Sequence, residues 1–155
     1  MKIGVDTNVF LALQNKESNY LACKKILDVI QQKQYSPDGS ILYEGILSTI
    51  VAAEILVGFY KKKQFEQSKE LINILVSSYK IIPVSLEISK EAARLRGELG
   101  VKLPDAIIAM TYHQANADIF ISNDHELTRK LSFDVLTPET FVNRYLQPKG
   151  KEVER

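Results

Sequence analysis

The chain has 155 residues, 45% of them hydrophobic, and its 20 Lys and Arg nearly balance its 19 Asp and Glu. This composition predicts one globular domain and excludes a strongly basic nucleic-acid binder, although a near-neutral total can hide a cationic rim around an acidic centre. Cys23 is the one cysteine, and no apolar run reaches the roughly 20 residues that a membrane helix needs, so we expect a cytoplasmic protein without membrane contact.

Strand-like runs and helical patterns alternate along the chain. Strands are expected over residues 2–5, 46–49, 80–84, 118–122 and 133–136. Helices are expected near residues 19–34, 50–62, 65–78, 86–99, 104–116 and 138–145. This alternation predicts an α/β fold with a mainly parallel sheet of about five strands. We assign residues 1–146 to a single domain, with a long loop over 35–45 and a frayed polar tail over 147–155.

Asp6 follows the first expected strand and opens an Asp-Thr-Asn turn into a helix. A carboxylate at the carboxyl end of a central parallel strand points into the crevice where α/β sheets bind ligands. Because Asp, Thr and Asn are also preferred helix N-caps, a capping role for Asp6 is the alternative.

Glu54 is the only charged residue in the stretch 50–60. On a helix its neighbours three and four residues away include Val51 and Val57, so we expect the carboxylate to lie among apolar side chains. An unpaired buried carboxylate costs on the order of several kcal/mol, so it needs a cation or strong donors. The alternative is a Glu54 that is partly exposed or paired with a lysine.

Asp105 stands behind Pro104 at the start of an expected helix, and Asp124 follows the fourth expected strand. Each has a simpler explanation. An acidic residue in a first helical turn interacts favourably with the helix dipole, and Asn123 or Asp124 suffices to cap the next helix.

The four acids together are harder to explain than any one of them alone. Two lie at strand ends and two on helices, and parallel strands bring their carboxyl ends to one edge of the sheet. Carboxylates without Cys or paired His select hard cations, so Mg²⁺ or Mn²⁺ is the expected occupant. Such ions activate water and stabilise charge at a phosphodiester, and without them at least one acid should titrate above its reference value.

The motifs around these acids resemble a PIN domain and are most similar to VapC-type toxins. They are, in order, Asp6-Thr7-Asn8, Ala53-Glu54, the run Leu-Pro-Asp-Ala-Ile-Ile-Ala over 103–109, and Ser122-Asn123-Asp124. The resemblance implies a three-layer α/β/α sandwich around the sheet and a metal-dependent ribonuclease. It implies an acidic quartet of Asp6, Glu54, Asp105 and Asp124, supported by Thr7, Asn8, Ser122 and Asn123. We expect Asp6 and Asp124 to be the chief metal ligands.

Basic residues near the acids are candidates for contact with an RNA substrate, with a solvated helix face as the alternative for each. They are Lys61, Lys62, Lys102 and Arg129. The helix expected over 65–78 also carries a broad apolar stripe of Phe65, Leu71, Ile72, Leu75 and Val76. Such a stripe suits a homodimer or a groove for an antitoxin peptide, and core packing is the alternative.

We therefore expect a Mg²⁺- or Mn²⁺-dependent endoribonuclease that acts as the toxin of a toxin–antitoxin pair and is held inactive by a small antitoxin protein. One alternative is a PIN-domain nuclease in RNA processing or decay that has no antitoxin. Another is a regulatory module that binds a cation or a basic peptide and hydrolyses nothing.

Overall fold

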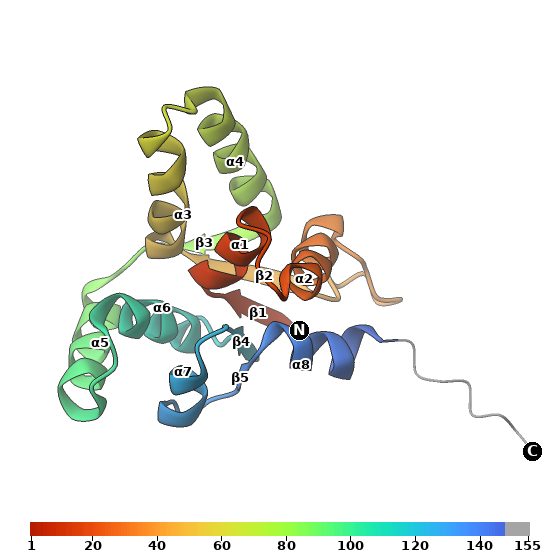
Figure 1. The fold of residues 1–155 in the computed structure, drawn as a ribbon. Coiled ribbons are helices and arrows are strands. Elements are labelled where there is room, and N and C mark those ends of the chain that lie inside the picture. The colour runs from red at the N-terminus through yellow and green to blue at the C-terminus, as the bar shows by residue number, and fades with distance from the viewer. Residues whose placement is uncertain (148–155) are drawn as a thin grey trace, which may run out of the picture.

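A computed structural model describes residues 1–147 of the chain. Five strands form one sheet in the order β3-β2-β1-β4-β5, and every neighbouring pair is parallel (Figure 1). The strands are β1 (Lys2–Val5), β2 (Glu44–Ser48), β3 (Tyr79–Ile82), β4 (Ile119–Ile121) and β5 (Val135–Leu136). The predicted α/β fold with a parallel sheet is confirmed. Most of the predicted polar tail, from residue 148 onward, lies outside the described residues.

Helices connect the strands and cover both faces of the sheet. They are α1 (Thr7–Gln14), α2 (Tyr20–Gln32), α3 (Thr49–Lys61), α4 (Phe65–Ser78), α5 (Leu86–Leu99), α6 (Leu103–Gln114), α7 (His125–Lys130) and α8 (Pro138–Phe141), with a π-helical turn η1 (Val142–Leu146) after the last. Figure 1 shows the α3–α4 pair rising above the sheet and the α5–α6 pair below it. Among the described residues, none of the helices combines the length and hydrophobicity that crossing a bilayer would take.

Two glycines show that α2 and α6 lie on opposite faces of the sheet. A Cβ at Gly45 would meet Ile30 of α2, whereas a Cβ at Gly4 would meet the ring of Tyr112 of α6. Gly45 pairs in register with Ile3, so Gly4 and Gly45 point to different sides of the sheet. The helices therefore form two layers around the sheet, as the predicted α/β/α sandwich requires.

The buried Tyr112 ties together the ends of the two central strands. Its hydroxyl donates to the carbonyl of Val5 at 2.5 Å and accepts from the backbone N–H of Ser48 at 3.3 Å. Its ring occupies the space beside Gly4, so only a residue without a side chain fits at that position. Because Val5 precedes Asp6 and Ser48 precedes α3, this contact positions the starts of two segments that carry predicted site residues.

The elements differ from the predictions mainly at their ends. Strand β2 begins at Glu44 rather than Ile46, because pairing with β1 extends it into a polar stretch, and the predicted loop over 35–45 loses its last two residues to the sheet. Within that loop, Tyr35 pairs with Ile41 in an isolated antiparallel bridge. The helix predicted over 138–145 is the short α8 followed by η1.

Candidate active site

The predicted acids gather where the carboxyl ends of β1 and β4 meet the starts of the following helices. Asp6 follows β1 and caps α1, and Asp124 follows β4 and caps α7. Asp105 lies in the first turn of α6, and Glu54 lies in the middle of α3. Strands β1 and β4 are neighbours, with Val5 opposite Ile121, so the turns that follow them lie side by side.

Asp6 is held rigidly by three donors. Its side chain is only 4% exposed, and it accepts from the Thr7 backbone N–H at 2.8 Å, from the Ser122 hydroxyl at 2.6 Å and from the Asn8 amide at 3.2 Å. The bond from Thr7 is the predicted capping interaction, and Asp6 therefore caps α1 while also facing the acidic edge. A capping role and a role in the candidate site are therefore compatible for Asp6.

The pKa values of Asp6 and Asp105 are raised, chiefly by burial and further by the neighbouring acids. Burial, opposed by the hydrogen bond from Ser122, raises the pKa of Asp6 to about 6, and the nearby charges of Asp105 and Glu54 add to the rise. Burial also raises the pKa of Asp105, assisted by the charges of Asp124 and Glu54. Carboxylates that repel one another, with Asp6 buried among them, favour a bound cation, since a positive charge relieves both the repulsion and the desolvation.

Ser122 links the two strand-end acids. It is fully buried, and its hydroxyl donates to Asp6 while accepting from the backbone N–H of Asp124 at 3.0 Å. The Asn8 side chain bridges the same two turns, donating to the Ser122 hydroxyl at 3.3 Å and accepting from the Asn123 backbone N–H at 3.0 Å. All four predicted supporting residues, Thr7 included, therefore lie in the network that surrounds the acids.

Asn19 joins this network although the sequence did not single it out. Its amide donates to the Asn123 side chain at 2.6 Å, from the residue that precedes α2. In the sequence Asn19 looks like an ordinary asparagine at the start of a helix. Such a residue carries no information about a hydrogen-bond partner more than a hundred residues away.

The expected burial of Glu54 is wrong. Helix α3 buries Val51 and Ile55, and Glu54 lies on the exposed side of the helix. The reason is that α3 turns the Val51 and Ile55 stripe toward its neighbouring elements, which a sequence with many apolar residues on several sides could not indicate. The carboxylate is nevertheless tied to the site, because Thr7 Oγ1 donates to Glu54 Oε1 at 3.0 Å.

A scan against protein-family models matches the PIN domain over residues 3–131. This chain belongs to the PIN domain family. PIN domains are generally nucleases, and they generally use divalent metal ions. No curated protein gives a match to this chain.

The solved structures most similar to this PIN domain include VapC-type toxin complexes. VapBC2 from Rickettsia felis, bound to a promoter DNA fragment, has a TM-score of 0.66 at 22% identity, covering 88% of this chain and 98% of that chain. A toxin–antitoxin complex from Klebsiella pneumoniae has a TM-score of 0.64 at 26% identity, covering 88% and 97%. VapBC-1 from nontypeable Haemophilus influenzae has a TM-score of 0.66 at 18% identity, covering 90% and 99%.

The donor set of this PIN domain fits a hard divalent cation. Its acids supply carboxylate oxygens, and the hydroxyl and amide groups around them are also oxygen donors of the kind that Mg²⁺ accepts. Within residues 1–147, no three acidic, His or Cys side chains converge closely enough to form a ready cage. Mg²⁺ does not need one, since it keeps several waters and is usually bound through one or two carboxylates.

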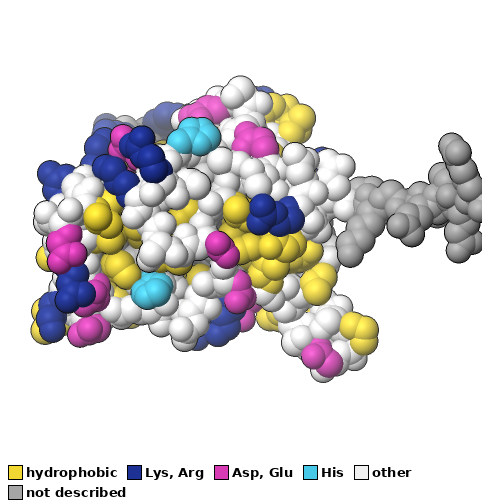
Figure 2. Space-filling view, turned by 90° about the horizontal axis from the view of Figure 1, so that it is seen from below, with side chains coloured by type: hydrophobic (Ala, Val, Ile, Leu, Met, Phe, Trp, Pro, Cys, Tyr) yellow, Lys and Arg dark blue, Asp and Glu magenta, His cyan; other side chains and the backbone are white. Residues whose placement is uncertain are grey.

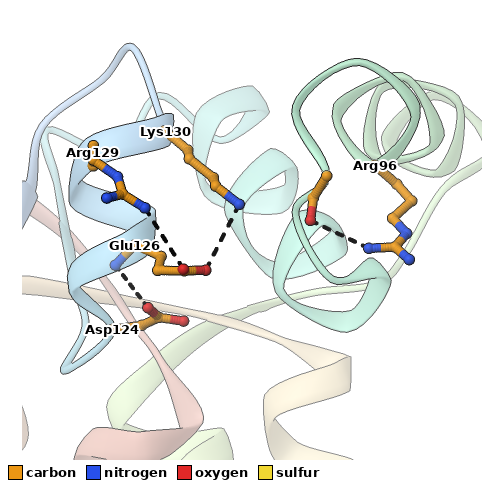
Figure 3. A network of polar contacts seen from close by, with 6 residues as sticks. Arg96, Asp124, Glu126, Arg129 and Lys130 are labelled. Carbon is orange, nitrogen blue, oxygen red and sulfur yellow. Dashed lines mark hydrogen bonds and ion pairs between the residues drawn. The ribbon is translucent and has the colours of Figure 1, made fainter.

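A cleft of about 500 Å³ opens beside the acids between the α5–α6 connection and α7. It is lined by Arg96, Gly100, Val101, Lys102, Asp105, Asp124, Glu126, Leu127 and Lys130. Figure 3 shows Lys130 reaching from α7 toward the side where Arg96 lies. Figure 2 shows that Lys and Arg side chains gather at the left end of the face seen from below, with Asp and Glu side chains among them.

The structure separates the four predicted RNA-contacting residues. Lys102 lines the cleft, close enough to Asp105 to oppose the rise in its pKa. Arg129 is not among the lining residues, and its side chain is 73% exposed. Lys61 and Lys62 follow the Glu54 position by two turns at the far end of α3, roughly 10 Å along the helix axis.

Proposed function

We propose that this PIN domain is a Mg²⁺- or Mn²⁺-dependent endoribonuclease and the toxin of a toxin–antitoxin pair. The observation that carries the proposal is the buried Asp6 carboxylate, which meets the charges of Asp105 and Glu54 at the carboxyl edge of a PIN-family sheet. A structural role alone would favour a neutral capping residue there, because the charge is costly to bury. A cation-dependent reaction explains why the charge is present.

The site would divide the work among its own residues. A bound Mg²⁺ or Mn²⁺ would lower the pKa of a water and stabilise the charge on the phosphate oxygens. Asp6 and Asp124 would be its chief ligands, with Asp105 and Glu54 completing the acidic edge. Ser122 holds the turns that carry Asp6 and Asp124 next to each other, because its hydroxyl contacts both the Asp6 carboxylate and the Asp124 backbone N–H.

Thr7 gives Glu54 a defined position on an otherwise exposed helix face. Its hydroxyl binds one oxygen of the Glu54 carboxylate, while its backbone N–H binds Asp6. The second oxygen of Glu54 has no hydrogen bond within the described residues, and it is thus free to accept a proton from water or to bind a hydrated cation.

The proposal extends to an antitoxin and a homodimer. The solved neighbours from Rickettsia felis and Klebsiella pneumoniae are toxin–antitoxin complexes. On this chain, Phe65, Ile72 and Val76 of the α4 stripe are 54%, 37% and 65% exposed, while Leu75 is buried. The stripe is therefore only partly used by the core, and its exposed part supplies apolar area for a partner protein or a second copy.

Cleavage of total RNA by the purified chain tests the nuclease. We expect discrete fragments with Mn²⁺, none with EDTA, and none from the Asp6→Asn/Asp105→Asn double variant. Asp28→Asn, which changes an exposed aspartate of α2 that pairs with Lys24, is the matched control and should cleave like the unmodified chain. Cleavage by the double variant at the unmodified rate would refute the proposed site.

Expression in cells tests the toxin assignment separately. We expect growth arrest by the unmodified chain but not by the double variant, with rescue by a small protein encoded next to it. Metal-dependent cleavage without growth arrest would favour the alternative of a nuclease in RNA processing or decay.

A further inference from the structure

The cleft between the α5–α6 connection and α7 is lined by both acidic and basic side chains. Asp105 and Asp124 lie among its lining residues, so it is continuous with the candidate active site. Arg96 of α5, Lys102 of the α5–α6 connection and Lys130 of α7 bring three cations to the same cleft. Its volume of about 500 Å³ lies within the roughly 300–1,000 Å³ range of small-molecule binding sites.

Two of the three cations, Arg96 and Lys130, are held more firmly than ordinary surface side chains. The Arg96 guanidinium donates to the Gly100 carbonyl at 3.2 Å, which holds the side chain against the C-terminal end of α5. A guanidinium has five N–H donors, so most of them remain available to a phosphate. The Lys130 side chain is only 28% exposed, in contrast to the 73% of its neighbour Arg129.

Glu126 lies where it would compete with an RNA phosphate for the neighbouring cations. Its carboxylate faces Arg129 at 3.6 Å and Lys130 at 3.7 Å, and Figure 3 shows both cations converging on it. Both separations are too long for a good hydrogen bond, and the Glu126 side chain is 66% exposed. Ion pairs of this kind contribute little, so an incoming phosphate can displace Glu126 at small cost.

We propose that this cleft binds the sugar-phosphate backbone of the RNA strand next to the cleaved bond, through Arg96, Lys102 and Lys130, and that Glu126 competes with the phosphate for Lys130. The proposal rests on the proposed function, because it takes RNA as the substrate. It replaces Arg129, Lys61 and Lys62 with Arg96 and Lys130 as the RNA-binding cations. Glu126 acts as a built-in competitor that weakens RNA binding.

Binding of a fluorescein-labelled 12-nucleotide single-stranded RNA, followed by anisotropy in EDTA over a range of salt, tests the cleft without requiring cleavage. Arg96→Gln, Lys102→Gln and Lys130→Gln should each lower the slope of log affinity against log salt by about 0.7, which corresponds to about fivefold weaker binding at 0.1 M salt. Lys130→Arg should retain binding, since it keeps the charge. Lys61→Gln is the matched control for the loss of one positive charge.

Glu126→Gln should tighten RNA binding severalfold, and this gain should vanish in the Lys130→Gln background. Glu66→Gln is its matched control, because Glu66 is an exposed helical acid that pairs with Lys69 at 3.4 Å on α4. The restraint by Glu126 is refuted if Glu126→Gln and Glu66→Gln have equal effects.

The whole proposal is overturned if the three cleft variants bind RNA like Lys61→Gln. This outcome differs from a failure of the proposed nuclease function, because RNA binding is measured without metal. If only the nuclease proposal is wrong, the unmodified chain does not cleave RNA, yet the three cleft variants still bind it more weakly. Thermal unfolding of each variant shows whether a loss of binding reflects a loss of folding.

Discussion

Replacement of Asp6 by asparagine should abolish cleavage and at the same time stabilise the metal-free protein. The folded state raises the pKa of Asp6 from 3.8 to about 6, chiefly because the carboxyl is buried. The folded chain therefore keeps this proton to a higher pH than the unfolded chain does. The free energy of unfolding then falls as the pH rises from about 4 to about 6, and the ionised Asp6 carries the full cost above that range.

The size of this cost follows from the shift. A difference of about two pKa units between the folded and unfolded states corresponds to about 3 kcal/mol at neutral pH. Asparagine removes the charge, and its oxygen can still accept from the Thr7 backbone N–H. Its amide nitrogen takes the place of the Asp6 oxygen that accepts from both Asn8 and Ser122, and we subtract about 1–2 kcal/mol for the two lost hydrogen bonds.

For Asp6→Asn we expect the free energy of unfolding to rise by about 1–2 kcal/mol at pH 8. This raises Tm by roughly 2–8 °C for a chain of this size. The gain should disappear at pH 4, where the folded protein already holds Asp6 largely protonated. Thermal unfolding in EDTA at both pH values measures it. Asp28→Asn provides the control, because the Asp28 side chain is 41% exposed and should give little change at either pH.

An equal rise in Tm at pH 4 and pH 8 would refute the buried-charge reasoning, since only an ionised Asp6 carries the cost. A fall in Tm at pH 8 would show that the three donors around Asp6 compensate its charge fully.

Three further outcomes follow from the same contacts. Gly4→Ala should destabilise the chain by about 1–3 kcal/mol in urea unfolding, because the added methyl group meets the Tyr112 ring, whereas Gly58→Ala on α3 meets nothing and should stabilise it by about 0.5–1 kcal/mol. Ser122→Ala should cost about 1–3 kcal/mol at pH 8 and raise the pKa of Asp6 further, measured by urea unfolding across pH. Mn²⁺ at about 100 times its Kd should stabilise the unmodified chain by about 2.7 kcal/mol in thermal unfolding and leave the Asp6→Asn/Asp105→Asn variant unchanged.

The exposure of Glu54 could not be predicted from the sequence pattern. The stretch 50–60 is apolar on more than one side, so its sequence does not say which side faces the protein. Packing of α3 against α1, α4 and α6 selects the side with Val51 and Ile55. Glu54 then needs no burial to belong to the site, because Thr7 reaches it from the neighbouring helix.

The sequence by itself determined the alternation of strands and helices along the chain and the approximate range of each. It also placed Asp6, Asp105 and Asp124 at the ends of these elements. These features depend on hydrophobic period, capping residues and turns, which act over a few neighbouring residues. Only the tertiary structure decided that Ser122 links two strand ends and that Arg96, Lys102 and Lys130 share one cleft with the acids. The physical reason is that these groups meet through the packing of elements distant in sequence, and local patterns carry no record of that packing.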